Sequence, residues 1–354
     1  MARPKYEKIA ETLKKEIING SIAPSSRLPK ITELAVRFDV SYVTMSNAIQ
    51  HLSDMGYVST VQGSGIFVND LPSKNYTNDI IYLAQIEGDL YGRCFRAMQD
   101  AMDDCSYNLI IGISNDKFYS LAEKNSKKAF DILKKYSEKT MIIDGTRHFP
   151  FAMLKKINPT GRNIYFFMHC ECAKDEFPEA VKIIPDFYQI GQTAAAELHR
   201  KGAEKLFLLS YEELSSKKAD FAGNPDCTYE NFILNGMKDY AQKNSLGEIT
   251  ILRGGNFTIN DCEQLEPYKN SSCGFMAIGD NRAHTLYRYA KTINVKINEN
   301  WHVIGLGNTS WCDIMDPKLA SFSLNEVSMM RRLASEIIEK SNSKYILWQP
   351  ELKE

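Results

Sequence analysis

The feature that most constrains the fold is an alternation, from residue 80 onward, of short apolar runs with amphipathic helical segments. The apolar runs occupy residues 80–84, 109–113, 140–144, 164–168, 205–209, 250–252, 274–278 and 301–306, and the helical segments 93–103, 121–135, 190–200 and 229–244. Continuous apolar strands separated by helices indicate parallel sheets that are covered on both faces. The series restarts after Pro185, so the sequence predicts an α/β fold with two Rossmann-like lobes. Ligands of such sheets bind beyond the carboxyl ends of the strands, which places a candidate site between the lobes.

The first seventy residues follow a different pattern. Apolar residues repeat at helical spacing over residues 5–19 and again over residues 31–38, and Ser41 is suited to cap a third helix. We expect that third helix to bury Val43, Ala48, Ile49 and Leu52. Residues 57–61 and 66–68 alternate like strands on either side of a glycine-bearing turn. Two short helices followed directly by a hairpin predict a winged helix-turn-helix, an α+β unit.

Charge supports a DNA-binding surface only locally. The whole chain has a net charge of -1, which provides no general attraction to nucleic acid or to an acidic membrane. Residues 1–53 contain eight Lys or Arg and five Asp or Glu, so this stretch carries +3. Any interaction with DNA is therefore expected to be confined to the first unit.

Residues 6–68 resemble the GntR family of bacterial regulators. The resemblance rests on the segments 18–20, 27–29, 33–35, 40–41, 55–57 and 62–68. They match the family in order, without insertions or deletions between them. It implies that the third helix enters the major groove and that the hairpin tip reaches the minor groove. The DNA-contacting residues implied in this way are Arg27, Lys30, Thr32, Ser41, Tyr42, Thr44, Ser46, Asn47, Gln50, Gln62, Gly63, Ser64 and Gly65.

This sequence departs from the GntR pattern at three DNA-facing positions. The family usually has arginine where Thr32, Tyr42 and Ser46 stand here. Arginine reads guanine edges with two hydrogen bonds, whereas Asn and Gln read adenine. The operator of this chain therefore cannot be inferred from that of better-known relatives.

Residues 80–347 are similar to the effector domain of LacI/GalR regulators and of sugar-binding periplasmic proteins. The similarity is carried by the segments 186–195, 202–206, 279–283, 303–308 and 317–322. A GntR-type DNA-binding domain joined to such an effector domain resembles the arabinose-repressor subgroup. This resemblance implies a homodimer. The expected organisation is a DNA-binding domain over residues 1–69, a linker over 70–79 and a two-lobed effector domain over 80–354. The chain is expected to cross between the lobes near residues 184, 307 and 322.

Several polar and aromatic residues at strand ends are candidate contacts for a small effector. Hydroxyl groups of a sugar need hydrogen-bond partners, and its C–H face packs on an aromatic ring. The candidates, with Asp280 first, are Asp280, Asn308, His169, Tyr91, Arg93, Asp89, Trp311 and Asn231. Family members that bind sugars commonly have an arginine where this chain has Ile233, which leaves a metabolite other than a sugar open as the effector.

The remaining features favour a regulator over other classes. The chain has no dinucleotide fingerprint, no nucleophile–histidine pattern and no metal-ligand spacing, so we expect neither enzymatic activity nor a cofactor. Cys170 and Cys172 form a C-x-C pair without a second pair, which favours packing at a strand end over metal binding. No signal peptide or bilayer-length apolar run is present, so a cytoplasmic protein without membrane contact is expected. The alternative is a small-molecule-binding protein, or a regulator of a non-sugar metabolite, in which DNA reading is altered or lost.

Overall fold

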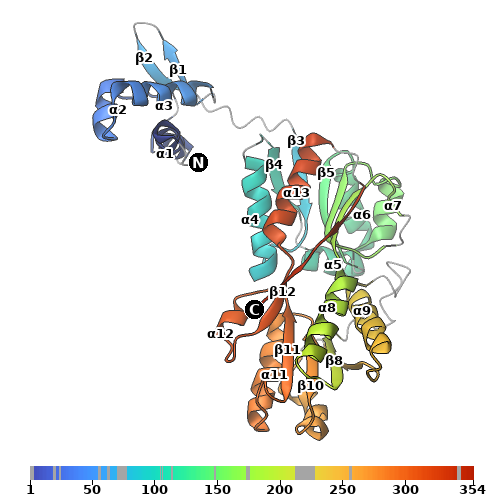
Figure 1. The fold of residues 1–354 in the computed structure, drawn as a ribbon. Helices are drawn as coiled ribbons and strands as arrows, with labels where there is room; N and C mark the ends of the chain where they lie inside the picture. Colours follow the sequence, from blue (N-terminus) through green and yellow to red (C-terminus); the bar gives the residue numbers. More distant parts are fainter. Residues whose placement is uncertain are drawn as a thin grey trace. The chain divides into compact units, whose positions relative to one another are not determined.

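The chain divides into two compact units, Met1–Tyr76 and Thr77–Glu354, whose elements are labelled in Figure 1. The computed structural model describes residues 4–18, 21–23, 25–54, 57–61, 64–69, 78–103, 105, 107–112, 115–146, 149–172, 176–211, 228–254, 257–340 and 344–354. The boundary between the units falls within the expected linker 70–79, of which residues 70–77 lie outside the described part. Among the described helices, none is long and apolar enough to cross a bilayer.

The first unit consists of helices and an antiparallel hairpin. Its elements are α1 (Lys5–Ile18), α2 (Ile31–Arg37), α3 (Tyr42–Asp54), β1 (Val58–Val61) and β2 (Gly65–Val68). Leu13 of α1, Leu34 of α2 and Leu52 of α3 pack in one core with Val58 and Val68, which lie opposite each other in the hairpin. This is the winged helix-turn-helix expected from the sequence.

The buried face of α3 differs from the one expected. Val43 is 66% exposed, whereas Met45 is fully buried together with Ala48, Ile49 and Leu52. Positions 45, 48, 49 and 52 follow the i, i+3, i+4, i+7 spacing of one helical face, and position 43 does not belong to that face. The expectation that Val43 is a core residue was wrong, and its side chain lies on the polar face of α3.

The second unit consists of two lobes, each with a sheet covered by helices. The first lobe contains β3 (Asn78–Leu83), α4 (Asp89–Asp103), β4 (Tyr107–Ile111), α5 (Asn115–Lys124), α6 (Ser126–Lys135), β5 (Thr140–Gly145), α7 (Phe151–Ile157), β6 (Ile164–Cys170), β7 (Val181–Pro185), α13 (Glu326–Glu339) and β13 (Tyr345–Trp348). The second contains α8 (Phe187–Arg200), β8 (Lys205–Ser210), α9 (Tyr229–Lys243), β9 (Thr250–Arg253), α10 (Ile259–Cys262), the 3-10 helix η4 (Glu263–Tyr268), β10 (Cys273–Ala277), α11 (Asp280–Thr292), β11 (Trp301–Leu306), α12 (Trp311–Ile314), β12 (Ala320–Ser323) and β14 (Glu351–Lys353).

Both sheets are six-stranded and almost entirely parallel. The strand order is β13-β7-β6-β5-β3-β4 in the first lobe and β14-β12-β11-β10-β8-β9 in the second. Only β14 runs antiparallel, beside β12. The α/β class with two Rossmann-like lobes therefore agrees with the expectation from the alternating apolar runs.

The chain passes between the lobes at three places, one of which differs from the expectation. It leaves the first lobe at Asp186, between β7 and α8, and returns at Leu324 and Asn325, between β12 and α13. It crosses again at Gln349 and Pro350, between β13 and β14. Residue 307 is not a crossing, because β11 and β12 on either side of it are neighbours in the second sheet.

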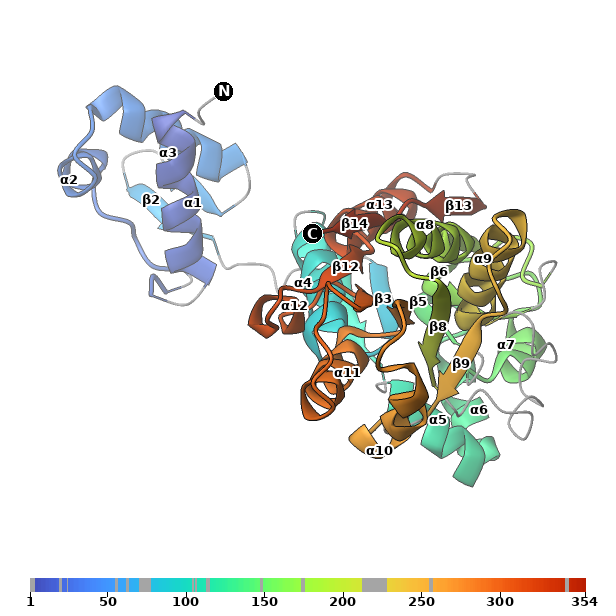
Figure 2. The same cartoon turned by 60° about the horizontal axis from the view of Figure 1, so that its bottom comes forward.

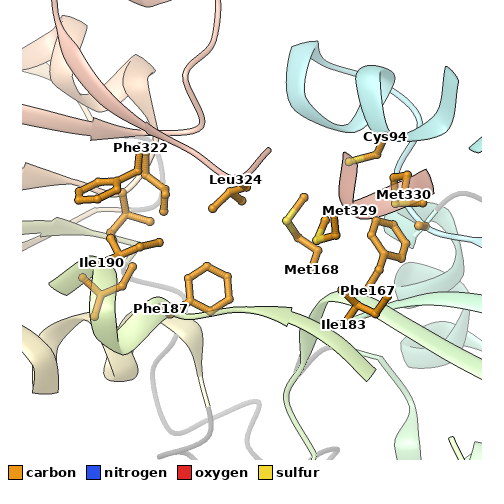
Figure 3. Close-up of a cluster of buried hydrophobic side chains, with 14 of the residues drawn as sticks. Cys94, Phe167, Met168, Ile183, Phe187, Ile190, Phe322, Leu324, Met329 and Met330 are labelled. Carbon is orange, nitrogen blue, oxygen red and sulfur yellow. The ribbon is translucent and has the colours of Figure 1, made fainter. Parts of the chain in front are cut away.

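A continuous apolar cluster extends across the lobe boundary. Phe187, which directly follows one crossing, and Leu324, which lies within another, belong to it together with Met168 of β6 and Met329 of α13. Figure 3 shows Phe187 and Leu324 between the side chains of the two lobes. The hinge segments are therefore anchored by buried side chains, and the boundary positions the polar groups described below.

Helices α8 and α9 lie side by side in the second lobe (Figure 2) and approach each other through glycines. A Cβ atom at Gly191 would lie 2.0 Å from the carbonyl oxygen of Ile233, and one at Gly236 would lie 2.1 Å from that of Tyr188. Ile233 is fully buried at this contact. Close packing of α9 on α8 thus accounts for an apolar residue at position 233.

We expect Gly191→Ala to lower the free energy of unfolding of the second unit by about 2 to 3 kcal/mol, because the added methyl meets backbone atoms that cannot move without shifting a helix. Thermal or urea unfolding measures the change. Gly247→Ala is the matched control, since a Cβ there has no neighbour within 4 Å. Equal stability of the two variants would contradict the close helix contact.

Candidate functional site

The exposed face of α3 carries polar and apolar side chains but no arginine. Tyr42 is 55% exposed beside Val43, and Asn47 and Gln50 are exposed further along the helix. Ser41 caps the helix, because its hydroxyl oxygen accepts a hydrogen bond of 3.2 Å from the Thr44 backbone N–H. The first turns of such a helix are the part that contacts base edges in helix-turn-helix proteins.

Several expected DNA contacts surround one hollow of the first unit. This hollow of about 400 Å³ is lined by Arg27, Lys30, Thr32, Tyr42 and Gly65, among others. The Arg27 side chain lies against Gly65, where a Cβ would come within 2.6 Å of the Arg27 Nε atom. Gly65 has a φ of 116°, a backbone conformation that favours glycine.

Of the remaining expected DNA contacts, two serines do not line this hollow, and two residues lie outside the described part of the chain. Ser46 is half-buried on α3 and Ser64 is exposed before β2. Gln62 and Gly63, at the expected tip of the wing, lie outside the part that the structure describes. The face formed by α3, Arg27 and Lys30 is termed the reading face below.

A buried polar group lies at the lobe boundary around His169, at the end of β6. The His169 Nδ1 atom is 2.6 Å from a carboxylate oxygen of Asp144, at the end of β5. The His169 ring stacks on Phe187 with centroids 5.8 Å apart and contacts Tyr229, the first residue of α9, at 4.7 Å. Residues from both lobes therefore surround this imidazole, which is only 7% exposed.

Two glutamates complete this polar group. Glu171, in the first lobe, accepts a hydrogen bond of 3.0 Å from the backbone N–H of Tyr229, in the second. Glu230 accepts one of 3.3 Å from the backbone N–H of Tyr211. Both glutamate side chains are buried. Asp144, His169, Glu171, Tyr229 and Glu230 are termed the boundary cluster.

Charge and burial shift two pKa values in the boundary cluster. Burial raises the pKa of Glu230 to about 7, although the backbone hydrogen bond from Tyr211 and the charge of Arg282 act to lower it. Burial acts to lower the pKa of His169, but the Asp144 carboxylate, with Glu171 and Glu230, outweighs it and raises that pKa. The cluster therefore combines groups that can accept and donate protons near neutrality.

The raised pKa of Glu230 predicts a pH dependence of stability. The folded state holds the proton more tightly than the unfolded state, so this contribution is present below the ordinary pKa of 4.5 and is lost as the pH rises to about 7. We expect Glu230→Gln to raise the melting temperature relative to the unaltered protein more at pH 8 than at pH 5. The control is Glu248→Gln, at an exposed position. A difference between variant and unaltered protein that is the same at both pH values would contradict the assignment.

Asp280, the first candidate from the sequence, is engaged by protein groups. Its Oδ2 atom accepts hydrogen bonds from the backbone N–H and the hydroxyl of Thr309, at 2.7 and 2.8 Å. Its Oδ1 atom accepts one of 2.6 Å from the hydroxyl of Ser321. The carboxylate is only 1% exposed. In this structure Asp280 holds the loop after β11 against β12, which differs from the direct effector contact expected from the sequence.

Arg93 and Asp89, on α4 of the first lobe, contact the same loop after β11 across the lobe boundary. The Arg93 guanidinium donates to the carbonyl oxygens of Gly307 and Asn308, at 3.1 and 3.4 Å. It also pairs with the carboxylates of Asp89 and Glu326. The backbone N–H of Ser310 donates to Asp89 at 2.6 Å. Loop 307–310 with Arg93, Asp89 and Asp280 is termed the loop clamp.

The loop clamp borders a polar hollow of about 490 Å³. Asp89, Arg93 and Asn308 line it together with Asp313 and Lys318. None of its lining residues is aromatic, so it lacks the ring surface on which a sugar packs. Of the sequence candidates, Asp280, Asp89, Arg93 and Asn308 thus belong to the loop clamp. His169 belongs to the boundary cluster.

The other three candidates belong to neither the loop clamp nor the boundary cluster as defined above. Trp311, 37% exposed, packs on His284 with ring centroids 4.6 Å apart. Tyr91 is half-buried on α4. Asn231, in the first turn of α9, lines a hollow of about 80 Å³ with Tyr211 and Glu230, which places it beside the boundary cluster.

The sequence interpretation missed all three carboxylates of the boundary cluster. Asp144 is within β5, close to its carboxyl end, and Glu171 follows β6. The rule that selected His169, a polar residue at the carboxyl end of a strand, applies equally to these two carboxylates. Glu230 has no such signal, because it lies on α9. Among the described residues, no three His, Cys, Asp or Glu come together in a way that could hold a metal ion.

Comparison with known proteins identifies the first unit. Residues 5–68 match the family "Bacterial regulatory proteins, gntR family". The chain is 32% identical over 91 residues to the mannosyl-D-glycerate transport/metabolism system repressor MngR of Escherichia coli, covering 26% of this chain and 37% of that protein. It is 27% identical over 116 residues to the arabinose metabolism transcriptional repressor of Geobacillus stearothermophilus, covering 32% of each. The chain spans about a third of the length of these curated relatives.

The second unit resembles solved structures of periplasmic-binding-protein type in fold. The periplasmic binding protein/LacI transcriptional regulator of Alkaliphilus metalliredigens, complexed with D-xylulofuranose, superposes with a TM-score of 0.56 at 16% identity. The match covers 78% of this chain and 97% of that structure. At this identity the likeness establishes the fold alone. The chain therefore joins a GntR-type DNA-binding domain to a periplasmic-binding-protein-like unit, as expected from the two resemblances in the sequence.

Proposed function

We propose that this chain is an effector-responsive transcription regulator, a repressor of carbohydrate-utilisation genes. It binds a pseudo-palindromic double-stranded operator as a homodimer in the cytoplasm, and a small sugar bound between the sensor lobes changes its affinity for DNA. The observation that carries the proposal is the combination, in one chain, of a complete winged helix-turn-helix with a two-lobed unit whose boundary holds buried polar groups. Its relatives are transcription regulators, which supports a role in regulation without catalysis.

The boundary cluster has the chemistry of a site for a polyhydroxylated ligand. Carboxylate oxygens of Asp144, Glu171 and Glu230 accept hydrogen bonds from hydroxyl groups, and Tyr229 and Phe187 provide ring faces for C–H bonds. The names of the relatives are consistent with this chemistry, since one represses arabinose metabolism and one solved neighbour holds D-xylulofuranose. We therefore assign the effector to the boundary cluster and Asn231, and treat the loop clamp as part of the mechanism.

The boundary cluster is closed in the present structure. The adjoining hollow of about 80 Å³ is smaller than the roughly 300 Å³ of an ordinary small-molecule pocket. Entry of a sugar therefore requires the lobes to separate, which breaks the contact between Glu171 and Tyr229. Effector binding would change the populations of an open and a closed state, and the operator affinity would follow by about 1–3 kcal/mol of coupling.

The reading face favours A·T base pairs over G·C pairs. Asn47 and Gln50 can each make two hydrogen bonds to adenine, and the exposed methyl groups of Val43 can contact the thymine methyl. Arg27 and Lys30 supply charge for phosphates. We expect operators selected from a random library to carry adenine and thymine where α3 contacts base edges.

Anisotropy measurements with a selected operator test the DNA-binding part of the proposal. We expect Asn47→Ala to weaken specific binding about tenfold and to relax the preference at one base pair, because one two-bond contact is lost. The control is Thr12→Ala, which removes an uncharged polar side chain at an exposed position of α1. It should leave the affinity for the operator unchanged. The complex should also weaken steeply with rising salt. If the affinity for DNA depends neither on salt nor on Asn47, the result would instead support a small-molecule-binding protein whose DNA-binding domain has lost its function. The absence of arginine on α3 favours this alternative.

Thermal unfolding against a panel of pentoses, hexoses, deoxyhexoses and nucleobases tests the effector. A ligand at a hundred times its dissociation constant stabilises the unit it binds by about 2.7 kcal/mol. We expect a shift with a sugar, and that sugar should change operator affinity. A shift only with a nucleobase would replace the sugar by another metabolite, and no shift would leave a regulator without an effector in this panel.

A further inference from the structure

Two cysteines are in direct contact beside the boundary cluster. The Sγ atoms of Cys170, the last residue of β6, and Cys172 are 3.6 Å apart. Among the described residues no other two cysteines are in contact, and the described cysteines are all reduced. The pair shares one hydrogen bond between thiols, so the two sulfur atoms already face each other.

The surroundings of the pair differ for its two members. Cys172 is 4% exposed within an apolar cluster of the first lobe, and Cys170 is half-buried against the same cluster. The hydrogen bond from the Cys170 thiol lowers the pKa of Cys172, and the ammonium of Lys182 lowers it further. The same hydrogen bond, together with burial, raises the pKa of Cys170. Cys172 is therefore the better nucleophile of the two, and Cys170 is placed to react with it.

Glu171 connects this pair to the other lobe. It lies between the two cysteines in sequence, and its carboxylate accepts the hydrogen bond from the Tyr229 backbone N–H across the boundary. Its own backbone N–H donates to the carbonyl oxygen of Gly145 at 2.7 Å. Any change in the backbone between Cys170 and Cys172 must therefore alter one of these contacts of Glu171.

We propose that Cys170 and Cys172 form a reversible disulfide with hydrogen peroxide as the oxidant, and that this bond releases the contact of Glu171 with the second lobe. The Cys172 thiolate attacks one peroxide oxygen, the O–O bond breaks, and the departing hydroxide takes a proton and leaves as water. The Cys170 thiol then loses its proton and attacks the sulfur of the sulfenic acid, whose S–O bond breaks to release a second water. In total two thiols and one peroxide give one disulfide and two waters.

Formation of the bond requires the sulfur atoms to approach from 3.6 Å to about 2.05 Å. The resulting ring contains the backbone of Glu171, so its torsions change and its carboxylate moves from the start of α9. The lobe boundary loses a hydrogen bond in the oxidised state. Peroxide would thus act on the same boundary that we assign to the effector, although formation of the disulfide itself does not depend on that assignment.

Peptide mass spectrometry of the full-length protein tests the bond. After peroxide treatment and alkylation of free thiols, the tryptic peptide 163–174, which contains both cysteines, should be two hydrogen masses lighter and unalkylated. Dithiothreitol should restore two alkylation sites. Cys105→Ala, at an exposed cysteine away from the pair, should behave like the unaltered protein, whereas Cys170→Ser should abolish the bond. A peptide carrying two alkyl groups, or only sulfinic or sulfonic acid, overturns the proposal.

Hydrogen exchange tests the consequence. In the oxidised protein the backbone amide of Tyr229 should exchange at least about tenfold faster, because its hydrogen bond to Glu171 is lost. A peptide that begins several residues before Tyr229 measures this exchange. Oxidised Cys170→Ser, which cannot form the disulfide, should show no such change, and neither should untreated protein. An intact disulfide with unchanged exchange at Tyr229 would overturn the link to the lobe boundary. If no sugar in the panel above shifts the melting temperature, the disulfide and the faster exchange at Tyr229 are still expected. The two proposals can therefore fail separately.

Discussion

Asp280→Ala is expected to lower the free energy of unfolding of the second unit by about 3 kcal/mol. The carboxylate accepts three hydrogen bonds, and its loss leaves the Thr309 N–H and the hydroxyls of Thr309 and Ser321 without their acceptor inside the protein. Chemical denaturation followed by the fluorescence of Trp301, a buried residue of β11, measures the change. The first unit contains no tryptophan, so its unfolding does not contribute to this signal.

Graded variants distinguish the clamping role of Asp280 from a direct contact with the effector. Ser321→Ala removes one of the three hydrogen bonds and should cost less than Asp280→Ala, whereas Asn281→Ala, at the exposed neighbouring position, should cost nothing. If Asp280 holds the loop, effector affinity should fall in proportion to stability across these variants. An Asp280→Asn protein with unchanged stability that no longer responds to the effector would restore the role expected from the sequence.

The sequence predicted the elements whose apolar residues are regularly spaced. The α1 stripe of Ile9, Leu13 and Ile17 and the buried strands of both lobes follow from periodicity, because one face of each element must be covered. Val43 was assigned to the wrong face because the chosen positions did not follow a single helical stripe. That error was avoidable, since Met45, Ala48, Ile49 and Leu52 have the correct spacing.

Other features of the fold carry little local signal. β13 has Tyr345 and Leu347 exposed, so it lacks the continuous apolar run that marks the central strands. The crossing at Gln349 and Pro350 therefore could not be recognised, and the turn after β11 was taken as a crossing instead. The order of the strands and the places where the chain crosses between the lobes depend on contacts between distant segments. Hydrophobic periodicity gives no information about such contacts.

The candidate site was predictable in position but not in detail. The strand-end rule selects His169 and applies equally to Asp144 and Glu171, because all three are at or near carboxyl ends of parallel strands. It also selected Asp280, but its partners Thr309 and Ser321 are 29 and 41 residues away. Whether a strand-end carboxylate is open to a ligand or bound by the protein depends on such distant groups.

Arg93→Met is expected to destabilise the second unit by about 3 kcal/mol and to weaken the contact of the first lobe with the loop after β11. The guanidinium neutralises Glu326, whose side chain is 8% exposed, and binds two backbone carbonyls of the second lobe. Removing one partner of a buried ion pair leaves the other charge without compensation, which costs more than the pair itself contributes. Arg96→Met, an exposed arginine on the same helix, is the matched control and should be neutral.

The double variant Arg93→Met, Glu326→Gln separates the two effects of Arg93. It removes the buried charge, so it should recover part of the stability lost in Arg93→Met. It does not restore the hydrogen bonds to Gly307 and Asn308, so the lobes should remain easier to separate than in the unaltered protein. In the proposed mechanism the effector enters when the lobes separate, so the double variant should bind the effector more tightly than the unaltered protein. Weaker effector binding with recovered stability would mean that Arg93 contacts the effector directly, as the sequence alone suggested.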